Sequence, residues 1–236
     1  MNRVINVTRL QMNKRDVTFL VPGMIVLIVL VVSAIIALAL QRAGLDPADP
    51  SYAEGARFNS GIVWSLPGFL VYYGVQAVST TFPFALALGT TRRAYVLGTA
   101  IANIITAAYI TAILLVLLWI ELATGHWWFD IYVLDNHLLG SGDPLVLAGA
   151  AFLGVLLCTS LGGLFAAVWV RYGNKGPTFL GLALGLVLAV LVLVFVPYAA
   201  EIVAAMTGAT LAWIALGLAA VSVFGTWLAM RRTAVR

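Results

Sequence analysis

The sequence is poor in charged residues, and this scarcity restricts its class. Only 9% of its 236 residues are Asp, Glu, Lys or Arg, whereas 63% are hydrophobic. An ordinary soluble domain carries roughly 25% charged residues. A soluble fold would have to bury six long apolar helices that have almost no polar face. The composition therefore predicts an integral membrane protein of the all-α class.

Side chains that form disulfides or bind metals are also scarce. The single cysteine, Cys158, excludes an internal disulfide and any metal site built from several cysteines. The only histidines, His126 and His137, lie eleven residues apart with no cysteine beside them. We therefore expect both histidines to be ordinary surface residues, and we expect no metal site.

The common enzyme motifs are absent as well. The sequence holds no G-x-x-x-x-G-K-[ST] phosphate-binding loop, no H-E-x-x-H and no G-x-S-x-G. No ionisable residue lies near the centre of an apolar stretch, where proton relays and ion-coupled sites place theirs. We therefore expect a chain that is no enzyme, has no cofactor of its own and is no proton-driven pump. Any uphill transport would take its energy from elsewhere.

Six apolar stretches dominate the chain. Each reaches about 20 residues, enough for a helix to cross a hydrocarbon core of ~30 Å. The stretches are 18–40, 62–80, 94–120, 145–170, 179–199 and 211–230. The first is too long for a signal peptide and is interpreted as a retained span. The expected organisation is an N-terminal arm (1–17), a six-span membrane domain (18–230) and a basic tail (231–236).

The charges between these stretches are sorted by sign. Alternate segments hold eleven of the thirteen basic residues: Arg3, Arg9, Lys14, Arg15, Arg92, Arg93, Arg171, Lys175, Arg231, Arg232 and Arg236. The other segments hold eight of the nine acidic residues: Asp46, Asp49, Glu54, Glu121, Asp130, Asp135, Asp143 and Glu201. Only Arg42 and Arg57 are basic there. The positive-inside bias then predicts that both termini are cytoplasmic, and it explains the basic residues without a nucleic-acid partner.

The N-terminal arm alternates apolar residues with basic and amide residues. Val4, Val7 and Leu10 are among the apolar ones. Two interpretations stay open: an amphipathic helix in the lipid headgroup region, or an irregular basic terminus.

Small residues recur at helical spacing in the fourth and fifth stretches. They are Ala150, Gly154, Cys158, Gly162 and Ala166 in the fourth, and Gly181 and Gly185 in the fifth. Small side chains every four residues let helix backbones approach closely in lipid. We expect tight helix packing there, either within one chain or between two.

Uncharged polar residues share faces of the second and third stretches. Tyr72 and Gln76 belong to the second, and Thr99, Asn103 and Thr106 belong to the third. Polar groups in lipid need partners, so these faces should point toward protein or water. Hydrogen bonds between helices would explain them, and so would a translocation path.

A distinctive segment separates the second and third stretches. An apolar run ends at Gly89, which suits a helix C-cap, and Thr90 or Thr91 can cap the following helix. Arg92, Arg93 and an aromatic residue come next. Taken alone, these residues are explained if the second span stops at the membrane edge and the two arginines set the topology.

The segment 88–95, Leu-Gly-Thr-Thr-Arg-Arg-Ala-Tyr, resembles the turn between spans two and three of bacterial ABC-2-type transporter permeases. The resemblance implies six spans in the bacterial plasma membrane, an amphipathic N-terminal helix and a cytoplasmic coupling helix between spans two and three. It implies a pore formed with a second copy or a paralogous permease. ATP and Mg²⁺ would be bound by separate ATPase subunits. The residues that would couple to them are Gly89, Thr90, Thr91, Arg92, Arg93 and Tyr95.

The function expected from this resemblance is export. The substrate would be lipophilic or amphipathic, because the helix faces that could line a path are apolar with a few hydroxyls and amides. A membrane scaffold or sensor without an ATPase partner is the alternative.

Overall fold

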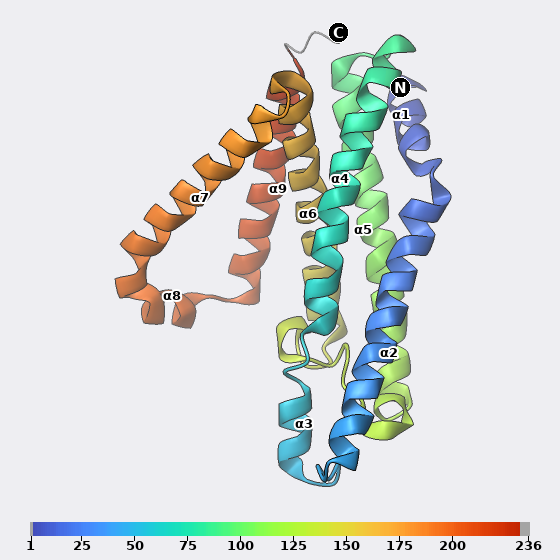
Figure 1. Cartoon of the computed structure of the whole chain (residues 1–236), viewed down its shortest axis with the longest axis vertical. Coiled ribbons are helices and arrows are strands. Elements are labelled where there is room, and N and C mark those ends of the chain that lie inside the picture. Colours follow the sequence, from blue (N-terminus) through green and yellow to red (C-terminus); the bar gives the residue numbers. More distant parts are fainter. Residues whose placement is uncertain (1, 232–236) are drawn as a thin grey trace. The chain divides into compact units, whose positions relative to one another are not determined.

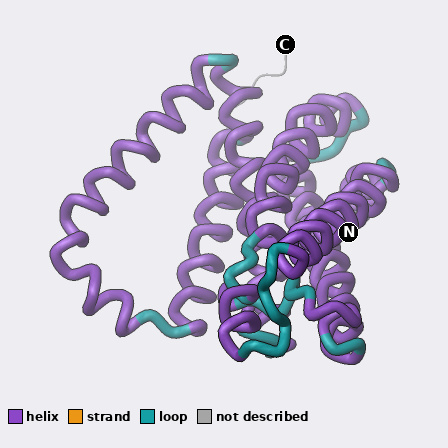
Figure 2. The backbone as a smooth tube through the Cα atoms, turned by 60° about the horizontal axis from the view of Figure 1, so that its bottom comes forward, coloured by secondary structure: helices purple, strands orange, loops and turns teal. Residues whose placement is uncertain are grey.

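A computed structural model describes residues 2–231 of the chain, and in this part the secondary structure is helical without any strand (Figures 1 and 2). The predicted tail residues Arg232 and Arg236 lie outside the described residues. The main helices are α1 (Asn2–Met12), α2 (Val21–Arg42), α3 (Pro50–Ala56), α4 (Gly61–Ala87), α5 (Arg92–Ala123), α6 (Pro144–Tyr172), α7 (Lys175–Phe195), α8 (Ala199–Ala205) and α9 (Gly208–Met230).

The six predicted spans are confirmed as helices that are long and apolar enough to cross a membrane. Their bounds are Asp16–Arg42, Ser51–Ala87, Arg92–Ala123, Pro144–Tyr172, Lys175–Ile202 and Gly208–Met230. The N-terminal arm also forms a helix, α1, rather than an irregular segment. The all-α, multi-pass membrane class is therefore the class of this chain.

The second span is longer than predicted, and no separate coupling helix follows it in the described chain. The sequence suggested an end at Thr80, but α4 continues through Pro83 to Ala87. Phe82 and Ala85 on this extension are almost fully buried, and their packing keeps the helix intact. Only Leu88–Thr91 separate α4 from α5. The prediction of a separate coupling helix is therefore corrected: the last turn of α4 and the tight turn after it occupy this segment.

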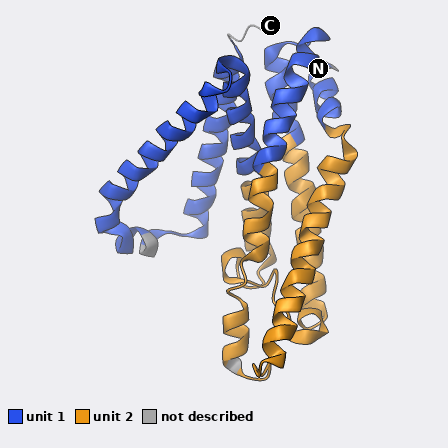
Figure 3. Cartoon of the chain, viewed as in Figure 1, with its two compact units in different colours: residues 1–11, 71–102, 157–236 blue, residues 12–70, 103–156 orange. Residues whose placement is uncertain are grey.

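The chain divides into two compact units, coloured separately in Figure 3. Unit 1 comprises residues 1–11, 71–102 and 157–236, and unit 2 comprises residues 12–70 and 103–156. Helices α4, α5 and α6 contribute residues to both units. Each unit is described by itself below.

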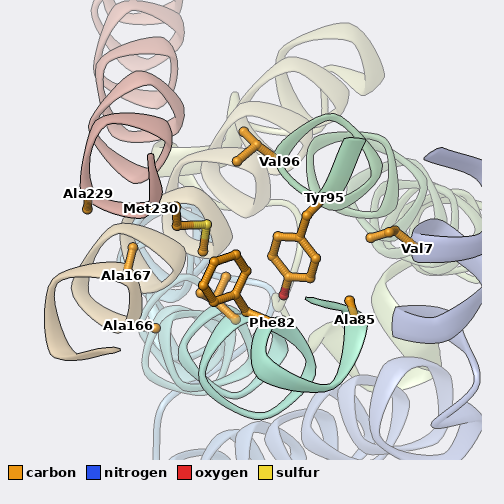
Figure 4. Close-up of a cluster of buried hydrophobic side chains, with 10 residues drawn as sticks. Val7, Phe82, Ala85, Tyr95, Val96, Ala166, Ala167, Ala229 and Met230 are labelled. Carbon is orange, nitrogen blue, oxygen red and sulfur yellow. The ribbon is translucent and has the colours of Figure 1, made fainter. Parts of the chain in front are cut away.

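Unit 1 has an apolar core made by α1, α4, α5, α6 and α9 (Figure 4). Tyr95 of α5 and Phe82 of α4 lie at its centre, with their ring centroids 5.0 Å apart in an edge-on arrangement. Val7 brings α1 into this core, and Met230 brings the end of α9. Helices in lipid associate mainly through close van der Waals packing, so the interlocking side chains of this cluster stabilise the contacts among these helices.

Helix α7 of unit 1 has no such packing. Its most apolar stretch of 18 residues has a mean hydropathy of 3.1, and none of these residues is buried. A hydrophobic helix of this length is compatible with lipid on all sides. It returns through α8 to α9, whose start is capped by reciprocal hydrogen bonds between Thr207 and Thr210.

Unit 2 consists of α2, α3, parts of α4, α5 and α6, and the connection between α5 and α6. This connection contains two short turns, η2 (His126–Asp130) and η3 (His137–Leu139). Tyr109 of α5 packs edge-on against Phe19, with centroids 4.8 Å apart, and its hydroxyl donates to the Phe19 carbonyl oxygen. The segment Asp16–Leu20 before α2 is thereby held against α5.

Candidate functional site

The turn between α4 and α5 has the capping geometry that the sequence predicts. Gly89 adopts a φ of +76°, which favours glycine, and its N–H donates to the carbonyl oxygen of Leu86. The Thr90 N–H donates to the carbonyl oxygen of Ala85, which completes a Schellman motif. Of the two candidate N-caps the structure selects Thr91, whose hydroxyl accepts from the Ala94 N–H at 3.3 Å. The turn is therefore short and well defined.

The predicted coupling residues differ in exposure. Gly89, Thr91 and Arg93 are exposed, Thr90 and Arg92 are half-buried, and Tyr95 is fully buried. The Arg92 guanidinium donates to the backbone carbonyl oxygen of Arg231, at the end of α9. Arg93 is thus the arginine of the pair that lies open to solvent. Because Tyr95 is fully buried, it offers no surface to a partner subunit, and its contribution is to hold the start of α5 in position.

Tyr95 joins three helices of unit 1 through its hydroxyl. The hydroxyl donates to the Ala77 carbonyl oxygen at 2.9 Å and lies 2.7 Å from the Thr81 hydroxyl, both on α4. Gln11 of α1 donates its amide to the Tyr95 hydroxyl at 3.4 Å and to the Thr99 hydroxyl at 2.6 Å. A movement of the start of α5 would therefore be transmitted to α1 and α4.

Helix α1 is seated on α5 by a second contact. The Thr8 hydroxyl donates to the carbonyl oxygen of Gly98 at 3.0 Å. A β carbon at Gly98 would lie 2.7 Å from the β carbon of Val7 and 2.8 Å from the Val4 carbonyl oxygen. Glycine at this position is what allows the two helices to approach so closely.

The residues predicted for a translocation path fall into two groups. Thr99, Asn103 and Thr106 lie on a buried face of α5, and the Thr106 hydroxyl has no hydrogen-bond partner among the described residues. The outward pair on α4 is Tyr72, which is exposed, and Gln76, which is half-buried; the Gln76 amide donates to the Tyr72 hydroxyl at 2.8 Å. The outward pair satisfies itself in part and is available to a neighbouring chain.

The small-residue positions also divide. Gly162 and Ala166 of α6 are buried in unit 1, where Gly162 meets Gly74 of α4. Cys158 is half-buried. The remaining positions are exposed in the single chain: Ala150, Gly154, Gly181 and Gly185.

A buried polar cluster in unit 2 was not predicted from the sequence. Glu121, at the end of α5, is fully buried and accepts three backbone hydrogen bonds. Its Oε1 accepts from the N–H groups of Val133 and Asp135, at 2.9 and 3.1 Å, and its Oε2 accepts from that of Leu134 at 2.9 Å. The carboxylate therefore anchors the chain that returns from η2.

Asp135 forms the second half of this cluster. Arg57 donates to it through Nε at 3.2 Å and Nη2 at 3.0 Å, and the Nε2 atom of His126 lies 3.0 Å from its Oδ2. The Asp135 side chain is only 2% exposed. Arg57, one of only two basic residues in the acidic segments, is the sequence signal that a carboxylate lies nearby.

The turn η2 is held in a strained conformation. His126, Trp127, Trp128 and Asp130 all have φ values between +54° and +63°. Each such residue costs roughly 1–3 kcal/mol and persists only where its surroundings impose it. The His126 ring stacks on Tyr132 with centroids 4.0 Å apart, and the Thr124 hydroxyl accepts from the Trp127 N–H. Burial raises the pKa of Tyr132, so its phenol stays neutral at physiological pH.

Neither histidine lies in a group that could hold a metal ion. The described residues contain no set of three His, Cys, Asp or Glu side chains close enough for this. His137 instead packs against Phe58 and lies 3.2 Å from the Ser141 hydroxyl.

No family model, curated protein or solved structure matches this chain.

Proposed function

We propose that this chain is the membrane subunit of an ATP-driven exporter of the ABC-2 type in a bacterial plasma membrane. A second copy or a paralogous permease would complete the pore, and separate ATPase subunits would supply the energy. The observation that carries the proposal is the tight turn between α4 and α5, which presents Arg93 to solvent and continues directly into the packed core of unit 1.

This turn is suited to transmit force. Arg93 is exposed, and Tyr95, two residues later, is fully buried between α1 and α4. Because packed side chains resist compression, a push on the turn would move α5 together with its neighbours. An ATPase that docks against Arg93 through an acidic group would therefore act on the helices rather than on a loose loop.

The outward Tyr72 and Gln76 support an assembly of two chains. Polar groups that face hydrocarbon are unfavourable unless they are satisfied. A second membrane subunit beside this face of α4 would cover them, and a path between the subunits would be mostly apolar with a few hydroxyl and amide groups. Such a lining suits a lipophilic or amphipathic substrate.

The proposed orientation places both termini and the α4–α5 turn in the cytoplasm. Its test uses a chain in which the only cysteine is removed (Cys158→Ser) and one exposed cysteine is introduced, either Ser51→Cys or Arg93→Cys. In intact cells, a membrane-impermeant maleimide should label the first variant at once. It should label the second only after permeabilisation. The reverse pattern would contradict the orientation.

The ATPase partner is tested by purifying the tagged chain in a mild detergent and identifying what is bound by mass spectrometry. We expect a stoichiometric ATPase subunit, and we expect Arg93→Glu to reduce its recovery about tenfold, because the charge reversal replaces attraction with repulsion. The matched control is Lys175→Glu, at an exposed basic residue at the start of α7.

Two results would contradict the proposal. A pure, correctly inserted chain without any ATPase would favour a scaffold or a sensor. Equal loss in the Arg93→Glu and Lys175→Glu variants would show that general surface charge, and not this turn, determines the association.

A further inference from the structure

Unit 2 contains an open cavity of about 710 Å³ beside the end of α2. It is enclosed by the last turns of α2, the segment that joins α2 to α3, α3 itself, the end of η2 and the residues that follow η2, and all of its lining residues belong to this unit. Volumes of roughly 300–1,000 Å³ are typical of small-molecule sites. The cavity is therefore large enough for an organic ligand.

One wall of the cavity is apolar. Ile36 and Leu40 of α2 and Phe58 after α3 line it, and all three side chains are largely exposed, with 75% exposure for Phe58. These surfaces gain free energy if a ligand covers them, at about 25 cal/mol per Å² of apolar area. The wall thus favours a ligand with an apolar body.

The remaining lining is acidic. Asp46, Asp49 and Asp130 contribute to it, and its described lining includes neither lysine nor arginine, although the whole chain has a net charge of +4. Asp46 and Asp49 each accept one backbone hydrogen bond, from the N–H groups of Ala48 and Ser51. The hydrogen bonds from Ser51 also lower the pKa of Asp49, which keeps it ionised.

Several hydrogen bonds hold the walls in place. Asn59 donates its amide to the Ser33 hydroxyl at 3.1 Å and to the Tyr132 carbonyl oxygen at 2.9 Å. Gln41 donates to the Tyr52 hydroxyl at 3.0 Å and to the Phe129 carbonyl oxygen at 2.8 Å. These four hydrogen bonds connect α2 and the α3 region with η2 and the residue Tyr132 after it, so the cavity is preformed and a ligand need not order it.

We infer that this cavity binds an organic cation with an apolar body. The apolar wall covers the body, and the three aspartates stabilise the positive charge. The aromatic rings of Phe58 and Tyr52 add attraction for a cation. The inference concerns the cavity alone and does not depend on the proposed ATPase.

The acidic groups of the cavity do not favour a compact metal ion as the occupant. A divalent cation needs several oxygen ligands at about 2.0–2.6 Å. The described part of the chain brings no three acidic, histidine or cysteine side chains close enough for that. Separated carboxylates around an apolar wall match a large cation whose charge is spread or shielded.

The test is equilibrium dialysis of the purified full chain in maltoside micelles, which contain no ammonium lipid. The probe is tetraphenylphosphonium, and protein-free micelles correct for partitioning. Tetraphenylborate, of the same size and opposite charge, is the matched anion. We expect saturable binding of the cation and at least tenfold weaker binding of the anion.

The decisive variant is Asp46→Asn/Asp49→Asn/Asp130→Asn. Asparagine keeps a side-chain oxygen for the turns at Asp46 and Asp49, so only the charge changes. We expect Kd for the cation to rise about tenfold or more. If the triple variant is poorly folded, Asp46→Asn/Asp49→Asn, at two exposed positions, should still raise Kd several-fold. The control is Asp143→Asn, whose carboxylate makes the same kind of turn with Leu145 but lies outside the cavity.

Added phosphatidylethanolamine separates two sources of the cation. If this lipid competes with the probe, the natural occupant is a lipid headgroup ammonium, and if it does not, the occupant is a soluble cation. The inference is overturned if the anion binds as well as the cation, if the triple variant binds like the unchanged chain, or if Asp143→Asn weakens binding equally.

Discussion

Replacing Gly162 by alanine is expected to lower the thermal unfolding midpoint of the purified chain by about 10 °C. A β carbon at this position would overlap the carbonyl oxygen of Val71 and would lie 2.9 Å from the Val75 nitrogen and 3.0 Å from the α carbon of Gly74. All three neighbours are backbone atoms of α4, so no side chain can rotate away. Overpacking of this kind costs up to about 3 kcal/mol, and 1 kcal/mol corresponds to roughly 2–4 °C in a chain of this size.

The same contact is predicted from the opposite helix. A β carbon at Gly74 would overlap the carbonyl oxygen of Thr159, with the α carbon of Gly162 at 3.1 Å. Gly74→Ala should therefore be as harmful as Gly162→Ala. The double variant should cost less than the sum of the two, because both changes force apart the same pair of backbones.

Gly154→Ala is the matched control for this prediction. Gly154 belongs to the same helix and the same small-residue stripe, but it is exposed, and a β carbon there would meet nothing within 4 Å. Alanine is the better helix former by about 1 kcal/mol, so the midpoint should stay or rise slightly. A loss at Gly154 equal to that at Gly162 would contradict the assignment of the close contact to Gly162, and would indicate that the outer part of the stripe packs against another chain.

This division of the stripe shows what periodicity could and could not predict. Small residues every four positions predicted a face of α6 suited to close approach, and Gly162 and Ala166 on this face are buried while Ala150 and Gly154 are exposed. The spacing could not indicate which members meet a neighbour, because the partner, Gly74, lies about 90 residues earlier in the sequence. In the same way, the length of the apolar stretches predicted six helices, but the burial of Phe82 and Ala85, which extends α4 to Ala87, depends on packing against other helices.

The polar cluster of unit 2 could not be predicted from the sequence, because its members are far apart along the chain. By position in the sequence, Asp135 and Glu121 belong to acidic segments between the spans, where charged residues are usually solvated. Both are buried, and their partners come from backbone N–H groups and from Arg57, which a linear pattern does not place beside them. The turn at Gly89 could be predicted because its capping signals are local: a glycine at the helix end followed by a threonine.

Glu121→Ala is expected to be the most harmful single change in unit 2. The substitution removes the acceptor of three backbone N–H groups, those of Val133, Leu134 and Asp135. Each buried donor that loses its partner costs about 1–3 kcal/mol. We therefore expect a loss of at least about 3 kcal/mol in the local stability of the connection between α5 and α6. Hydrogen–deuterium exchange of peptides that cover residues 131–139 should become roughly 100-fold faster or more.

Glu121→Gln distinguishes the hydrogen bonds from simple packing, because it keeps the volume of the side chain. Its amide oxygen, placed at Oε1, can still accept from Val133 and Asp135, whereas its NH₂ group would face the N–H of Leu134. Exchange should therefore rank the unchanged chain slowest, the glutamine variant intermediate and the alanine variant fastest. Glu201→Ala, at an exposed glutamate of α8, should not alter exchange in this segment. A glutamine variant as slow as the unchanged chain would mean that the charge of Glu121 contributes nothing. An alanine variant that is equally slow would show that the connection is held without Glu121, through the bond of Arg57 to Asp135 and the stacking of His126 on Tyr132.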